Sequence, residues 1–183
     1  MKATQQLKDE HEGIKLMLSI MEKISDDLKN GKELKVDHYK KIVDFLKVFA
    51  DKCHHGKEEE ILFPAMTEHG VPNTGGPIGV MLYEHEQGRG FIKEMSKALM
   101  EFENGNRDSL NSLISASNNY TDLLRNHIEK ENNILFMMAD QVLTEPEQSQ
   151  LFDEFEELEV EKIGLGKHEE YHHLLKELRE IYL

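Results

Sequence analysis

Apolar residues recur every three or four positions along most of this chain. The first stripe of this kind contains Leu7, Ile14, Leu18 and Met21, and comparable stripes continue through the sequence. Residues at these spacings share one face of an α-helix, whereas a half-buried strand shows strict alternation. The chain also has only 4 prolines and is rich in Leu, Glu, Lys and Met, which favour helix. The sequence therefore predicts an all-α protein.

Start and stop signals divide the stripes into separate helices. Asn30-Gly31 ends the first helix, and Asp37 is placed to cap a second that continues to about residue 68. The segment "HGVPNTGGP" is predicted to be a loop, and Pro77 suits the start of a third helix. A fourth helix follows "ENGN", and Thr144-Glu-Pro-Glu147 has the spacing of a capping box that would open another.

Four long amphipathic helices joined by short connections favour an antiparallel up-and-down four-helix bundle, over about residues 5–141. Additional C-terminal helices, over about residues 145–183, are expected to pack outside it. A chain of 183 residues can bury one good core, so residues 1–183 are predicted to form a single domain.

Net charge and cysteine content limit the classes of binding partner and the cellular compartment that we expect. The chain has 36 acidic and 22 basic residues, a formal net charge of -14 that repels nucleic acid and anionic membranes. It has 1 cysteine, no leader-like apolar segment and no run long enough to span a bilayer. We therefore expect a soluble, cytoplasmic protein.

Residues suited to metal coordination lie on the inward faces of all four predicted bundle helices. The two strongest stretches, "HHGKEEEILF" from His54 and "HIEKENNILF" from His127, align without gaps and share His, Lys, Glu and the Ile-Leu-Phe ending. Each contains His-x-x-x-Glu, which places an imidazole and a carboxylate one helical turn apart. The full set of inward donors is His11, His54, Glu58, His85, His127 and Glu131.

Helical phase separates the two adjacent histidines of the second helix. At about 100° per residue, His54 lies nearer the apolar stripe than His55, which falls almost opposite it. His54 with Glu58 is therefore the preferred inward pair. His55 with Glu59 is the reserve pair if the helix is rotated.

Two buried carboxylates close together would be costly unless a cation neutralised them. Four imidazoles and two bridging carboxylates form a nitrogen and oxygen donor set suited to iron, and manganese or zinc also match by ligand type. The alternative for any single histidine is an ordinary hydrogen-bonded core or surface residue. Convergence of all six donors favours a metal site.

These residues resemble the hemerythrin-like, HHE cation-binding family from about residue 7 to residue 138. The matching pieces are "DEHEGI", "HHGKEEEILFPAM", "YEHEQGR" and "HIEKENNILFMMA". The resemblance implies two non-haem irons within the bundle, with Glu58 and Glu131 shared. It implies that one iron binds His11 and His54, and the other His85 and His127.

The sequence departs from the oxygen carriers of that family at Met81, where they have a further histidine ligand. A missing ligand implies an open metal position, and His168 or His172 of the last helix is a candidate to fill it. We expect binding of dioxygen, peroxide or nitric oxide for sensing, scavenging or delivery. The alternatives are a slow redox enzyme (a peroxidase, or a nitric oxide or oxygen reductase) with an unknown redox partner, and a metal-dependent iron-sensing module. Repair of damaged iron centres fits less well, because relatives with that function carry an extra cysteine-bearing N-terminal segment.

Overall fold

The computed structural model describes residues 2–183, which contain helices and loops but no strand. The all-α prediction is thus confirmed. The first rod is α1 (Ala3–Lys29), and the second runs without a break through α2 (Val36–Phe45), η1 (Leu46–His55), η2 (Glu58–Leu62) and α3 (Phe63–Glu68). The third is α4 (Pro77–Glu103), and the fourth is α5 (Ser109–Lys130), η3 (Glu131–Leu135) and α6 (Phe136–Val142).

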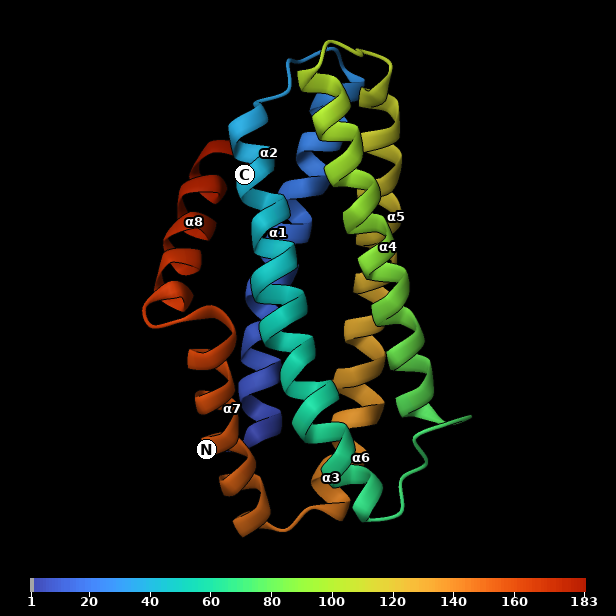
Figure 1. The fold of residues 1–183 in the computed structure, drawn as a ribbon, viewed down its shortest axis with the longest axis vertical. Coiled ribbons are helices and arrows are strands. Elements are labelled where there is room, and N and C mark those ends of the chain that lie inside the picture. The colour runs from blue at the N-terminus through green and yellow to red at the C-terminus, as the bar shows by residue number, and fades with distance from the viewer. Residues whose placement is uncertain (1) are drawn as a thin grey trace.

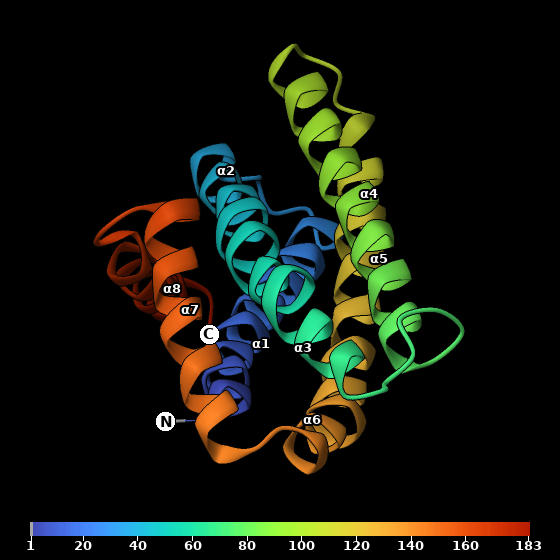
Figure 2. The same cartoon turned by 60° about the horizontal axis from the view of Figure 1, so that its bottom comes forward.

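These four rods lie side by side along the long axis of the molecule (Figures 1 and 2), an arrangement compatible with the predicted up-and-down bundle. Two further helices, α7 (Glu145–Ile163) and α8 (Lys167–Tyr182), follow the fourth rod and pack against α1 and the second rod. The view in Figure 2 places them on one side of the bundle, away from α4 and α5. Among residues 2–183, no helix combines the length and apolar character that crossing a bilayer requires.

Most helix ends follow the predicted signals. The first residue of α4 is Pro77, which tolerates this position because the first N–H groups of a helix have no partner within it. At the start of α7, Thr144 and Glu147 form the predicted capping box. The expected cap at Asp37 is wrong, because α2 begins at Val36; Asp37 instead lies in the first turn, where its charge favours the helix dipole.

The second and fourth rods contain π-helical segments, in which the backbone bonds i to i+5 and each turn holds more residues than in an α-helix. These are η1, η2 and η3. Both η2 and η3 begin at the glutamate of a His-x-x-x-Glu motif, Glu58 in one and Glu131 in the other. The equivalence of the two motifs therefore extends from sequence to backbone winding.

The core consists of two apolar clusters. On α1, Ile14 belongs to one cluster and Leu7 to the other, and the buried residues between them are Glu10 and His11. The same change occurs on α4, where His85 separates Met81 from Ile92. A polar layer thus crosses the bundle between two apolar regions that exclude water from it.

Candidate metal centre

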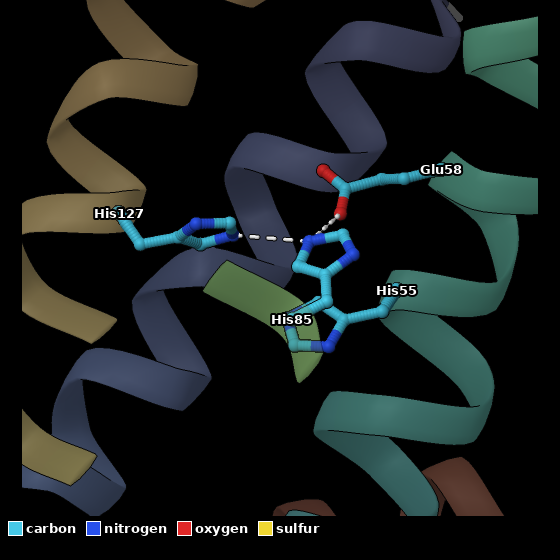
Figure 3. A group of neighbouring side chains, drawn as sticks. All are labelled: His55, Glu58, His85 and His127. Carbon is cyan, nitrogen blue, oxygen red and sulfur yellow. Dashed lines mark hydrogen bonds and ion pairs between the residues drawn. The ribbon is translucent and has the colours of Figure 1, made fainter. Parts of the chain in front are cut away.

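Seven buried side chains meet in this polar layer as two groups of potential metal ligands. In each group, one donor atom per residue lies within 4.8 Å of all the others. Figure 3 shows the first group, contributed by the second rod, α4 and α5. The groups are His55, Glu58, His85 and His127, and His11, His54, Glu58 and Glu131. Because Glu58 belongs to both, the two groups form one continuous site.

The inward nitrogens of the imidazoles face one another in pairs. His11 Nε2 lies 2.9 Å from His54 Nε2, and His85 Nε2 lies 3.2 Å from His127 Nε2. Two neutral imidazoles cannot both present lone pairs at this distance without repulsion, unless a proton or a metal ion lies against them. Each pair therefore needs either a proton or a metal ion between its two nitrogens.

Both glutamates extend from one imidazole group to the other. Glu131 Oε2 lies 3.2 Å from His11 Nε2, and Glu131 Oε1 lies 3.0 Å from His127 Nε2. Glu58 Oε1 lies 3.7 Å from His54 Nε2, and Glu58 Oε2 lies 3.4 Å from His85 Nε2. Both residues are completely buried, and none of their four carboxylate oxygens makes a well-directed hydrogen bond to residues 2–183. Carboxylates in this position are suited to bridge two cations.

The outward nitrogen of each imidazole has an oxygen acceptor. The pairs are His11 with Asn132 (2.9 Å), His54 with Glu10 (2.8 Å), His85 with Glu59 (2.6 Å), His127 with Glu84 (2.8 Å) and, at 3.4 Å, His55 with Asp51. A carboxylate or amide oxygen at Nδ1 fixes the proton there and leaves the Nε2 lone pair directed inward. Metal-binding histidines are held in this way.

The two halves of the bundle repeat one arrangement. The glutamate just before a ligand histidine reaches across to the imidazole on the neighbouring helix, and also accepts from the lysine three residues after that imidazole. The equivalent sets are Glu10, His11, His54, Lys57 and Glu58, and Glu84, His85, His127, Lys130 and Glu131. In the sequence, this arrangement leaves a trace as the dipeptide Glu-His in both "DEHEGI" and "YEHEQGR". Its role becomes clear only once the structure shows which helices lie next to each other.

The electrostatics of the layer also favour cations. Burial alone would lower the pKa of His85 and His127, but the facing carboxylates, above all Glu131, raise it to about 11 for His85 and about 9 for His127. For His55, burial and the neighbouring His85 and His127 push the pKa well below 6.5. His55 is therefore a neutral imidazole, the form that coordinates metals.

The six sequence-predicted donors all lie in the two groups, but the assignment of His55 needs correction. His55 is only 3 % exposed, and its ring stacks on that of His85 with centroids 3.8 Å apart. The expectation that it faces away assumed about 100° per residue, whereas π-helical winding in η1 turns less per residue and brings both His54 and His55 inward. Glu59 is not in either group; it accepts from His85 Nδ1 and pairs with Arg89.

The structure does not bring His168 and His172 into the metal layer. His168 donates from Nδ1 to Glu159 at 2.9 Å, and His172 is exposed beside it. Both line a cavity of about 200 Å³ between α8 and the bundle, which Glu10 also borders. Met81 is buried in an apolar cluster, one helical turn before His85 on α4. The additional imidazole on the His85 side of the layer is that of His55, which stacks on His85.

Comparison with known proteins identifies a family and similar proteins. The sequence model of the Hemerythrin HHE cation binding domain matches residues 2–139. The iron-sulfur cluster repair protein YtfE of Pectobacterium atrosepticum is 37% identical over 89 residues, which cover 47% of this chain and 40% of that protein. A probable iron-sulfur cluster repair protein of Haemophilus influenzae is 37% identical over 94 residues, 49% of this chain and 42% of that protein. The match thus spans less than half the length of these relatives, and no solved structure matches significantly.

Proposed function

Because the chain belongs to the hemerythrin HHE cation-binding family, we propose that it holds two non-haem irons in its polar layer and binds a small oxidant there. The oxidant is dioxygen, peroxide or nitric oxide, and the role is sensing, scavenging or delivery. The observation that carries the proposal is the set of four buried carboxylate oxygens of Glu58 and Glu131 that have imidazole nitrogens near them but no well-directed hydrogen bond.

The donors divide unequally between the two metal positions. His55, His85 and His127 would hold one iron, and His11 and His54 the other. Glu58 belongs to both groups, and the two oxygens of Glu131 lie near His11 and His127, so both glutamates would serve both irons. The nitrogen and oxygen donor set suits iron and also admits manganese or zinc. With two imidazoles against three, the His11–His54 position has fewer protein donors, and we assign the small oxidant to it.

The chain's own residues prepare this site before any ligand arrives. Iron held by these residues would supply redox chemistry. Glu10 and Glu84 keep the Nδ1 protons of His54 and His127 outward, so that the inward nitrogens stay free to coordinate. The apolar clusters on both sides of the layer exclude water and so limit loss of reactive species.

The metal content of the protein tests this proposal. Anaerobically purified protein should carry two irons per chain and develop oxo-bridge charge-transfer bands in air. The Glu131→Gln variant, which loses a bridging charge, should bind little metal, whereas Glu129→Gln, at an exposed position near Asn133, should bind as the wild type does. One zinc per chain and no near-visible absorption would contradict the proposal and favour a structural module.

Two rival functions share the same site. A slow redox enzyme would turn over peroxide or nitric oxide with an added electron donor, whereas a binding protein would take up one equivalent and stop. A role in iron-sulfur cluster repair is the second candidate, because both relatives are named as proteins of that kind. That role predicts that iron-loaded protein restores activity to an enzyme with an oxidatively damaged iron-sulfur cluster, while the metal-free protein does not.

A further inference from the structure

A buried lysine joins the metal layer to the C-terminal helices. Lys57 directly precedes Glu58 and has no exposed surface. Its ammonium donates to Glu10 Oε1 at 2.5 Å and to Glu159 Oε2 at 2.8 Å. A buried charge is tolerated only when it is paired, so both carboxylates are needed to hold it. One of them, Glu159, lies on α7.

These contacts form a chain of charged partners that ends at a metal-facing imidazole. Glu10 binds Lys57 with one oxygen and accepts from His54 Nδ1 with the other, at 2.8 Å. At the opposite end, Glu159 Oε1 accepts from His168 Nδ1 at 2.9 Å. The side chains from α8 to His54 are therefore linked without a break through Glu159, Lys57 and Glu10.

The repeated half of the bundle shows what Glu159 adds. Lys130 binds Glu84, which binds His127, as Lys57 binds Glu10 and Glu10 binds His54. The Lys130 side chain, however, is 37% exposed, and Glu84 is its only carboxylate partner within residues 2–183. Lys57 differs because α7 covers it and provides a second carboxylate. The two otherwise equivalent sides of the centre are thus made unequal by Glu159.

We propose that Glu159 is a positioning residue of the metal centre: it holds Lys57 against Glu10 and thereby fixes the orientation of His54 and the charge beside the His11–His54 position. This inference rests on the proposed iron site. It also means that α7, which begins at Glu145 beyond the matched family domain, contributes a residue that supports the metal site. The geometry is supported by the charge state of Glu159, because hydrogen bonds from His168 and Lys57 outweigh burial and lower its pKa to about 2.

The experiment compares two isosteric variants of the full-length chain. Glu159→Gln removes the charge that pairs with Lys57, while Glu156→Gln removes the same charge from an exposed position of α7 that contacts Gln6. Iron-loaded proteins are mixed with excess chelator, and iron release is followed by the loss of visible absorption. We expect Glu159→Gln to release iron about tenfold faster than the wild type, the lower end of the effect of outer-shell partners. Glu156→Gln should match the wild type.

Two further readouts separate positioning from general stability. The visible bands of Glu159→Gln should shift, because the charge near the iron changes, and adding Lys57→Met should abolish the difference between Glu and Gln at residue 159. The inference is overturned if Glu159→Gln releases iron at the wild-type rate with unshifted bands. It is also overturned if iron release merely follows the melting temperatures of the iron-free variants. Wild-type protein that binds no iron would instead contradict the proposed function itself.

Discussion

The metal-free protein should lose stability as the pH rises, because its buried layer then depends on protons for positive charge. The folded state raises the pKa of His127 from 6.5 to about 9 and that of His85 from 6.5 to about 11. A histidine with a raised pKa contributes stability that is fully present below pH 6.5 and is lost as the pH rises through the folded-state value. The expected window is therefore pH 6.5 to 9 and beyond.

The size of the effect follows from the pKa values. One pKa unit corresponds to about 1.4 kcal/mol, so the loss between pH 6.5 and 9 is about 3 kcal/mol for His127 alone. His85 adds to this, but repulsion between the two imidazolium ions reduces the sum, and we expect about 3–5 kcal/mol in total. This is a large share of the roughly 5–15 kcal/mol that stabilises a typical domain.

Urea unfolding followed by circular dichroism at pH 6.5 and pH 9, in the presence of a chelator, measures this loss. The His127→Gln variant should show a flatter dependence on pH, whereas His173→Gln, at an exposed position, should behave as the wild type. Iron-loaded protein should also show a flatter dependence, because bound metal replaces the protons. Equal stability of the metal-free wild type at both pH values would refute the reasoning.

Two other substitutions test separate features. His55→Phe keeps an aromatic ring stacked on His85 but removes a donor, so we expect metal analysis after chelator treatment to find one iron per chain. The control His173→Phe should retain two irons. If His55→Phe also retained two, His55 would not be a ligand. Thr144→Ala removes the capping hydrogen bond to the Glu147 N–H and should lower the free energy of unfolding by about 1 kcal/mol in urea denaturation. Ser149→Ala on the exposed face of α7 is the control, and an equal effect there would contradict a capping role.

Much of the fold was accessible from sequence because its signals are local. Stripes at helical spacing predict the helices, Gly31 and Pro77 mark boundaries, and Thr144 with Glu147 predicts a cap that the structure contains. Convergence of the donors could also be anticipated, since polar residues on an apolar stripe must enter the core. These inferences depend on residues a few positions apart.

The remaining features depend on winding and on helix pairing. No residue in η1 is a sequence signal for π-helical geometry, so the prediction assumed a regular α-helix and placed His55 outward. The partners of the outward nitrogens come from other helices in most cases, as Glu10 does for His54. Such a pairing cannot be inferred until the neighbouring helices and their relative height are known. The contact of Glu159 with Lys57 has the same origin, because 102 positions separate them.

The smaller angle per residue in the π-helical segments of the second rod also affects how many ligands a small bundle can supply. In a regular helix, consecutive residues diverge by about 100°, so two adjacent side chains rarely reach the same interior site. Underwinding around His54, His55 and Glu58 lets three donors from five consecutive residues enter one layer. The bundle therefore needs no fifth ligand-bearing helix, because the winding of the second rod brings an additional imidazole into the layer.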